Sequence, residues 1–259
     1  MTGSAAVAVD VNAERSRARF RISHPKGNII TADTIAALSA GLTSLAGNPH
    51  LKLITIEGAG GDFSYGASIP EHAPDRIRDV LPAMHRLIDA WLEAPAVTAA
   101  IVRGRCLGGG FELALACDLI FAADDAVLGL PEIALGVFPP AGAALLPVRV
   151  GGAIASRTVL TGESRAAIDW HRAGLIELLA PASSLDAAVD DWFAAHLAPR
   201  SAAALRHAAS ATRVAISAHV RRTLPELEGL YLQRLMRTND AAEGVAAFLE
   251  KRPPRWTDG

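Results

Sequence analysis

Short stretches of alternating or continuous hydrophobic residues predict a series of strands along the chain. Residues 17–22 alternate polar and apolar side chains, which is the period of a half-buried strand. Residues 5–11 are a matching partner, so we expect the chain to open as a hairpin-like unit. Apolar runs at residues 51–56, 97–102 and 119–122 predict further, more deeply buried strands.

Apolar residues at helical spacing separate these strands. In residues 31–45 they fall on one face of a helix, for which Thr31 or Asp33 is available as the N-cap. Residues 77–91 have the same spacing, but Pro82 lacks the amide hydrogen that an interior helical position needs, so we expect a kink or two helical pieces. The alternation of strands with helices predicts an α/β fold with crossover helices.

The last part of the chain is predominantly helical. Residues 199–249 contain three helical stretches, and Asp240 with Glu243 three residues later is a start signal for the last of them. We therefore predict a core of residues 1–198, which carries the active site, and a C-terminal helical region of residues 199–259.

Composition and charge exclude several classes of protein. The 259 residues are 51% hydrophobic, enough for a sizeable core, and the formal charge of −2 provides no basic field for phosphate backbones, so we expect no nucleic acid partner. Cys106 and Cys117 lack the spacing of a disulfide framework or a zinc site, so we expect buried thiols and no metal. The start of the chain lacks the pattern of a signal peptide, and no apolar stretch reaches the ~18 residues of a membrane span, which predicts a cytoplasmic protein without membrane contact.

Two glycine-containing loops could direct backbone amides at an anion. They lie at residues 63–68 and 107–112, the second at a predicted strand-to-helix junction. Glycine allows a close approach, and a helix start has unpaired N–H groups and a favourable dipole. From these residues alone, an oxyanion site and a plain structural turn are both open. A dinucleotide site is not supported, because Leu113 stands where its third glycine should be, and Pro70 replaces the glycine that ends a nucleophile elbow.

Two carboxylates, Glu112 and Glu132, stand twenty residues apart, each among apolar neighbours. Each alone could simply complement a helix N-terminus. Together with the glycine loops they could instead be a paired acid and base, because burial raises the pKa of one carboxyl group while hydrogen-bond donors keep the other ionised.

Several segments occur in an order that is specific for one protein family. The sequence has Phe-Ser-Tyr-Gly-Ala-Ser at 63–68, Gly-Arg-Cys-Leu-Gly-Gly-Gly-Phe-Glu-Leu-Ala at 104–114, Cys-Asp-Leu-Ile at 117–120, Gly-Leu-Pro-Glu-Ile-Ala-Leu-Gly at 129–136, Pro-Pro-Ala-Gly at 139–142 and Ala-Phe-Leu-Glu-Lys-Arg at 247–252. With them the chain resembles the enoyl-CoA hydratase (crotonase) family over nearly its whole length. The resemblance implies a spiral of ββα units with C-terminal helices that assemble homo-trimers or hexamers. It also implies an acyl-CoA thioester as substrate, with no separate cofactor.

The resemblance further implies roles for single residues. Ala67 and Gly109 match the two backbone donors of an oxyanion hole, and Glu112 and Glu132 match the two catalytic glutamates of the hydratases. The candidate substrate contacts are Lys26, Tyr65, Gly66, Ser68, Phe138, Phe248 and Lys251. The two C-terminal residues among them match positions that contact coenzyme A in the family, often from a neighbouring subunit.

Three features near the implied site depart from the usual family pattern or extend it. Tyr65 places a phenol beside the oxyanion loop, Pro140 stands where glycine is frequent, and His72 is the one histidine near that loop. We expect Tyr65 and Phe138 to present flat walls to a six-membered ring, although Tyr65 could instead pack into the core. His72 either lines the acyl pocket or is a solvated residue at a helix start. Residues 63–72 look similar to the hydratases that act on cyclohexa-1,5-diene-1-carbonyl-CoA.

The predicted function is hydration of a conjugated enoyl-CoA or cyclic dienoyl-CoA thioester. Two fixed N–H donors would stabilise the charge that develops on the thioester oxygen, while one glutamate takes a proton from water and its partner delivers one to carbon. A double-bond isomerase, which needs one principal base, is the alternative within the family. A non-catalytic or RNA-binding relative is the alternative from another class, and the two glutamates and the acidic pI argue against it.

Overall fold

The fold is built on a six-stranded sheet with a smaller three-stranded sheet beside it, in a computed structural model that describes residues 6–73 and 76–259. The large sheet has the order β1-β2-β3-β4-β6-β9, in which β1 is antiparallel to β2 and the other neighbours are parallel. The small sheet has the order β5-β7-β8. The strands are β1 (Val7–Val11), β2 (Arg17–Ile22), β3 (Leu53–Gly58), β4 (Val97–Val102), β5 (Arg105–Leu107), β6 (Leu119–Ala123), β7 (Val127–Gly129), β8 (Ser164–Ala166) and β9 (Leu178–Ala180).

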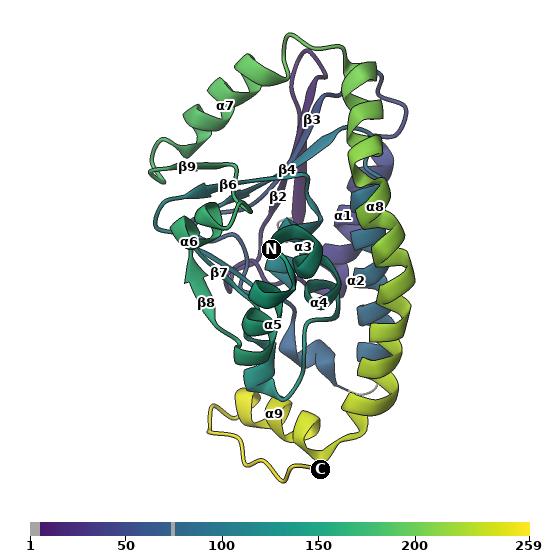
Figure 1. Cartoon of the computed structure of the whole chain (residues 1–259), viewed down its shortest axis with the longest axis vertical. Helices are drawn as coiled ribbons and strands as arrows, with labels where there is room; N and C mark the ends of the chain where they lie inside the picture. Colours follow the sequence, from purple (N-terminus) through teal and green to yellow (C-terminus); the bar gives the residue numbers. More distant parts are fainter. Residues whose placement is uncertain (1–5, 74–75) are drawn as a thin grey trace, which may run out of the picture.

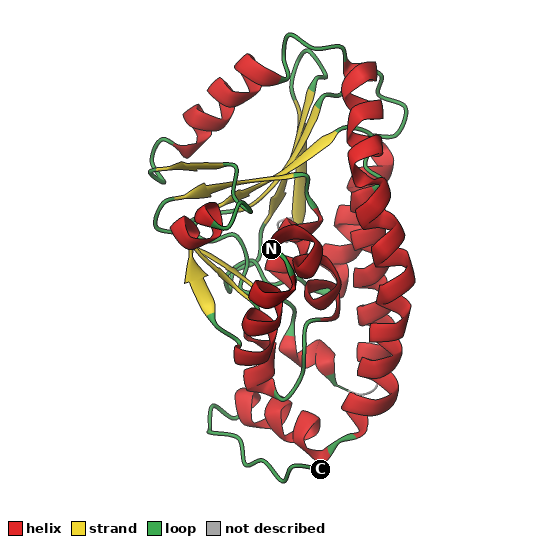
Figure 2. Ribbon diagram, in the orientation of Figure 1, coloured by secondary structure: helices red, strands yellow, loops and turns green. Residues whose placement is uncertain are grey.

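Helices connect the strands and extend beyond the sheets at one end of the molecule (Figure 2). Helix α2 packs against both α1 and α8. Helix α8 runs along one side of the molecule, and α9 lies across its end (Figure 1). The α-helices are α1 (Ala32–Ser44), α2 (Ile77–Leu92), α3 (Gly109–Ala116), α4 (Pro140–Val150), α5 (Gly152–Thr161), α6 (Ala167–Arg172), α7 (Leu185–His196), α8 (Ala202–Gly229) and α9 (Asn239–Leu249). The short helical turns are η1 (Ile69–His72), η2 (Pro131–Leu135), η3 (Leu230–Arg234) and η4 (Leu235–Arg237). The predicted α/β fold with a helical C-terminal region is confirmed.

The predicted opening hairpin is present, although residue 5 lies outside the described part of the chain. Ala18, Phe20 and Ile22 point from β2 into the core and are at most 1% exposed. The arginines between them face the other side, where Arg19 and Arg21 pair with Glu57 of β3 at 2.6 Å and 2.9 Å. The period-2 pattern therefore determines which face of β2 is buried.

The N-caps of α1 and α9 can be compared with those predicted from the sequence. Thr31 caps α1, since its hydroxyl accepts a hydrogen bond from the amide of Thr34 at 3.2 Å. The prediction of Asp240 as the cap of the last helix is wrong, because Thr238 has the extended backbone of an N-cap and its hydroxyl accepts from the amide of Ala241 at 3.2 Å. Asp240 lies inside the first turn, where its carboxylate instead accepts from the amide of Thr257 at 2.7 Å.

Pro82 does not divide the predicted helix over residues 77–91, because α2 continues through it to Leu92. The proline lies in the second turn of α2, so it removes only the hydrogen bond to the carbonyl of residue 78. The remaining turns bury Met84, Leu87 and Trp91 in the core. Burial of this apolar face offsets the lost hydrogen bond.

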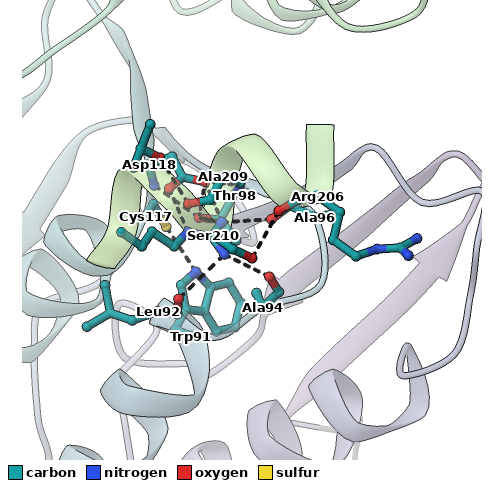
Figure 3. Close-up of polar contacts among 12 residues, drawn as sticks. Trp91, Leu92, Ala94, Ala96, Thr98, Cys117, Asp118, Arg206, Ala209 and Ser210 are labelled. Atoms are coloured by element: carbon teal, nitrogen blue, oxygen red, sulfur yellow. Dashed lines mark hydrogen bonds and ion pairs between the residues drawn. The ribbon is translucent and has the colours of Figure 1, made fainter. Parts of the chain in front are cut away.

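A buried ion pair ties α8 to the large sheet (Figure 3). Arg213 is 4% exposed and donates to the Asp118 carboxylate at 2.7 Å. The same guanidinium donates to the carbonyl groups of Ala94 and Ala96, each at 2.7 Å. Asp118 also accepts from the Thr98 amide at 2.8 Å, so the charges are paired and their remaining positions are hydrogen-bonded.

The main hydrophobic core crosses the predicted boundary between residues 198 and 199. Ile216, Val220 and Leu224 of α8 are buried in the same cluster as the strands and α2. The division into a core and a C-terminal region stays a prediction, with α8 packed along the core as one of its walls. No helix in the described residues is long and apolar enough to span a membrane.

Candidate active site

A cavity lies where segments far apart in the sequence meet beside α2 and α3. Eight of the residues singled out from the sequence line it: Ala67, Ser68, His72, Gly109, Glu112, Glu132, Phe138 and Pro140. Apolar side chains of α2 form part of its wall: Ile77, Val80, Leu81 and Met84. The cavity is therefore mainly apolar with two carboxyl groups at its lining, which is the usual character of a small-molecule site.

Glu112 is placed by the first turn of α3 and faces the start of α4. Its side chain is buried, with 7% of the residue exposed, and one carboxylate oxygen accepts from the amide of Gly142 at 2.7 Å. Burial raises the pKa of Glu112 to about 7, while hydrogen bonds from the amides of Gly142 and Ala141 act in the opposite direction. Helix α4 thus supplies fixed donors that favour the ionised form of this carboxyl group.

Glu132 comes from η2, the short turn that follows β7. One of its carboxyl oxygens, Oε2, is fully buried and has no hydrogen-bond partner within the described residues. Burial and, to a smaller extent, the negative charge of Glu112 together raise the pKa of Glu132 to about 8. Since the two groups repel as carboxylates, the pair favours a state in which Glu112 is ionised and Glu132 holds a proton.

Gly108 allows the two loops and Glu132 to come together. Its φ of +51° is a conformation that side chains disfavour, and a Cβ atom at Gly108 would lie 2.6 Å from Glu132 Oε1. Gly66 has a φ of +104°, and a Cβ there would lie 3.0 Å from the carbonyl oxygen of Leu107. The close approach of the two loops therefore depends on glycine at both positions.

The backbone amides of Ala67 and Gly109 lie close together where the two loops approach. A Cβ atom at Gly109 would lie 3.4 Å from the amide nitrogen of Ala67. The neighbouring amides are occupied, since Gly66 donates to the Ser64 hydroxyl at 3.0 Å and Ser68 donates to the carbonyl of Ile30 at 2.9 Å. Neither the Ala67 nor the Gly109 amide donates a hydrogen bond within residues 6–73 and 76–259. Two unpaired N–H groups beside a cavity can bind one oxygen that carries negative charge.

Comparison with known proteins identifies the family of the chain. The family model described as "Enoyl-CoA hydratase/isomerase" matches residues 13–259. The chain belongs to this family. It is 43% identical over 238 residues to a cyclohexa-1,5-dienecarbonyl-CoA hydratase of Thauera aromatica, which covers 92% of each chain. It is 35% identical over 238 residues to a probable enoyl-CoA hydratase of Mycobacterium bovis, covering 89% of this chain and 90% of the relative.

Solved structures of the family confirm the predicted crotonase-type fold. An enoyl-CoA hydratase of Mycobacterium avium subsp. paratuberculosis superposes with a TM-score of 0.87 at 29% identity, covering 99% of this chain and 100% of that one. A second enoyl-CoA hydratase, from Mycobacterium avium, superposes with a TM-score of 0.85 at 29% identity. The prediction of an enzyme of the enoyl-CoA hydratase type is thereby confirmed.

In this family member, His72 and Tyr65, which the sequence placed near the oxyanion loop, lie in different surroundings. His72 lines the cavity, and its Nδ1 lies 2.9 Å from the carbonyl oxygen of Ser68, so Nδ1 carries the hydrogen. Burial lowers the pKa of His72, which keeps the ring neutral. Tyr65 is 45% exposed, packs over Gly27 and lies 6.0 Å from the Arg105 guanidinium, outside the cavity.

The remaining candidate contacts lie away from the cavity lining. Lys26 is exposed in the turn before Asn28, and Gly66 is buried behind the loop with its amide already bonded to Ser64. Phe248 is 54% exposed near the end of α9, and Lys251 is exposed just after it. In the single chain, these two residues are positioned at the surface, so a role for them requires a substrate or a second subunit to reach α9.

Tyr231 is a cavity residue that the sequence analysis missed. It is 2% exposed and lies in η3, a π-helical turn that follows α8. Its ring packs edge-on against Phe138, with the ring centroids 5.5 Å apart. No local pattern distinguishes it in the sequence, because only the irregular turn after a long helix directs it into a cavity formed by other segments.

Proposed function

We propose that this enzyme adds water to the conjugated double bond of an acyl-CoA thioester. The observation that carries the proposal is the position of two buried carboxyl groups and two unpaired backbone amides around one cavity. Such donors are aimed at the oxygen on which negative charge develops, and they stabilise the enolate that forms when water attacks the β carbon. The thioester itself supplies the activation, so the proposed chemistry needs no cofactor beyond the coenzyme A of the substrate.

The two glutamates take different parts in the proposed reaction. Glu112, held by the amides at the start of α4, takes a proton from water as its oxygen bonds to the β carbon. Glu132, which has an unpartnered oxygen and the more strongly raised pKa, delivers its proton to the carbon chain as the enolate collapses. The opposite direction, dehydration, reverses both transfers.

A double-bond isomerase is the second candidate function, because the same amides would stabilise a dienolate. An isomerase moves one proton and needs one principal base, whereas this cavity is lined by two carboxyl groups of raised pKa. The pair favours hydration. An RNA-binding role has less support, since the chain has a net charge of −2 and both glutamates face the cavity.

We propose a ring-shaped acyl group as the substrate. Phe138 and Tyr231 present two aromatic rings to the cavity, so Tyr231 takes the place that the sequence prediction gave to Tyr65. Flat apolar walls suit a six-membered ring, and the 43% identical relative is named as a cyclohexa-1,5-dienecarbonyl-CoA hydratase. Cleavage of water from, or its addition to, such a ring would use the same oxyanion site.

The proposed function predicts a preference among substrates. The kcat/KM for cyclohexa-1,5-diene-1-carbonyl-CoA is expected to exceed those for crotonyl-CoA and for a longer straight-chain enoyl-CoA by at least roughly tenfold, since that ratio reports differential binding of the transition state. Mass spectrometry of the products measures the gain of water. A preference for a straight-chain ester would remove the ring proposal and leave general hydratase activity standing. Failure of every ester to gain or lose water would contradict the proposed function.

Coenzyme A binding and assembly extend the proposal to the C-terminal region. We propose that homo-trimers or hexamers bring α9 beside a substrate, where Lys251 contacts a phosphate group of coenzyme A. Lys251→Ala is then expected to raise KM for CoA esters by about three- to tenfold and to change kcat by less than twofold. The control is Arg222→Ala, which removes an exposed cation from α8. An unchanged KM in a Lys251→Ala enzyme that keeps its oligomeric state would remove Lys251 from the site.

A further inference from the structure

Tyr231 adds a third polar group to the cavity that contains the two glutamates. The tyrosine ring is fixed on its apolar sides by Phe138 and by a small cluster that includes Ile77, Val137 and Ala241. Its position results from η3, where a π-helical turn at the end of α8 changes the direction of the side chain. Buried neighbours therefore hold the ring of Tyr231 in place.

The hydroxyl group of Tyr231 is not used by the protein. No hydrogen bond joins it to another residue within the described chain, and it is not among the fully buried polar atoms that lack a partner, so the oxygen opens onto the cavity that Tyr231 lines. A hydroxyl that opens onto a cavity and has no protein partner can hydrogen-bond to water or to a ligand there. Since Tyr231 lines the cavity, the natural partner is a molecule inside it.

The charges around Tyr231 determine what the hydroxyl can do. Burial raises the pKa of Tyr231 well above its usual value, and the negative charges of Glu132 and Glu112 raise it further. The phenol and both carboxyl groups line the same cavity. The hydroxyl therefore keeps its proton at neutral pH and acts as a hydrogen-bonding group, not as a base.

We propose that the Tyr231 hydroxyl holds the reacting water in place, and this inference rests on the proposed hydration. The water has two hydrogens. One goes to Glu112 as the new carbon–oxygen bond forms, and the phenol oxygen accepts a hydrogen bond from the other, which directs a lone pair of the water at the β carbon. Glu132 then gives its proton to the α carbon, which leaves Glu112 protonated and Glu132 ionised. Transfer of the proton taken from water, from Glu112 to Glu132 through solvent, restores the starting state, and Tyr231 ends the reaction unchanged.

The Tyr231 hydroxyl is expected to act only in the step in which water attacks the β carbon. The removal of a hydrogen from the α carbon of a saturated acyl-CoA needs the two backbone amides and Glu132, but it needs no attacking water. A tyrosine that only shapes the cavity would affect both reactions alike. Comparison of the two reactions in one variant therefore distinguishes the roles.

The test is Tyr231→Phe, which keeps the ring and its contact with Phe138 and removes only the hydroxyl. Hydration is expected to fall by roughly 10- to 100-fold in kcat with KM changed less than about twofold, as for the loss of one hydrogen bond in a transition state. Exchange of the α hydrogen of a saturated acyl-CoA with D₂O, followed by NMR, is expected to stay within about threefold. Leu230→Ala, which removes an exposed side chain from the same turn, is the control and should leave both reactions unchanged.

Two results would overturn the inference. Hydration within about threefold of wild type would show that the hydroxyl does not act on water. A parallel loss of hydration and exchange, in a variant with an unchanged Tm, would show that Tyr231 shapes the cavity instead. A wild-type enzyme that adds water to no ester overturns the proposed function itself, which the wild-type assay detects before the variant is made.

Discussion

Replacement of Glu112 or Glu132 by glutamine is expected to lower kcat for hydration by about 10²- to 10⁴-fold, the range that general acid–base catalysis contributes. Glutamine keeps the shape of the side chain and can still accept the hydrogen bond that Gly142 donates to Glu112, but it cannot exchange a proton. Affinity for an unreactive CoA thioester, measured by calorimetry, is expected to change by less than about threefold. Glu226→Gln, an exposed replacement on α8, is the matched control.

The pH dependence of stability supplies a second measurement on the same variants. The ordinary pKa of a glutamate is 4.5, and burial raises the pKa of Glu112 to about 7 and that of Glu132 to about 8 in the folded protein. The stability that this protonation contributes is complete below about pH 4.5 and is lost as the pH rises through 7 and 8. The Tm of each glutamine variant, relative to wild type, is therefore expected to rise between about pH 5 and pH 8.5.

Near-wild-type hydration in either glutamine variant would contradict the two-glutamate mechanism. If one variant lost hydration and the other kept it, a single-base reaction such as isomerisation would explain the cavity better. A Tm difference that stays constant with pH would show that the replaced carboxyl group is not protonated by burial. These outcomes separate the chemistry of the pair from its effect on folding.

Removal of the Gly109 amide is the second change with a large expected effect. Gly109→Pro is expected to lower kcat by about 10²- to 10³-fold, since the loss of one oxyanion donor costs about 3 kcal/mol of transition-state stabilisation. Proline suits this site because Gly109 is the first residue of α3, where an amide hydrogen has no partner in the helix. Gly108 has φ +51° and ψ −128°, the mirror image of the extended conformation that a residue before proline usually adopts. Only glycine adopts this mirror conformation readily, so Gly108 can precede a proline.

The control for this variant is Gly109→Ala, which keeps the amide hydrogen. Its Cβ atom would lie 3.4 Å from the Ala67 nitrogen, a tight contact that small shifts can accommodate, so its kcat is expected to fall less than about tenfold. Steady-state kinetics and a melting curve for both variants give the measurement. Equal activity of the proline and alanine variants would show that the Gly109 amide does not stabilise the transition state.

Local patterns were sufficient for much of the framework. The alternation in residues 17–22 predicts β2 and its buried face, and Thr31, one of the two candidate caps in the sequence, caps α1. Local patterns do not decide whether Pro82 interrupts a helix or which of two nearby residues, Thr238 or Asp240, caps the last helix. At the start of α9, Thr238 has the extended backbone of an N-cap, and the Asp240 carboxylate accepts instead from the amide of Thr257, which is distant from the first turn in sequence.

The sequence by itself determined the family, the positions of β1, β2, β3, β4 and β6, and the two glutamates with their glycine loops, because these depend on residue type and order along the chain. Only the tertiary structure decided which side chains share the cavity. Tyr65 lies beside Ala67 in sequence but faces outward, whereas Tyr231 reaches the cavity from the end of α8. The physical reason is that the direction of a side chain depends on the backbone turn that carries it and on neighbours from distant segments, which no local period encodes.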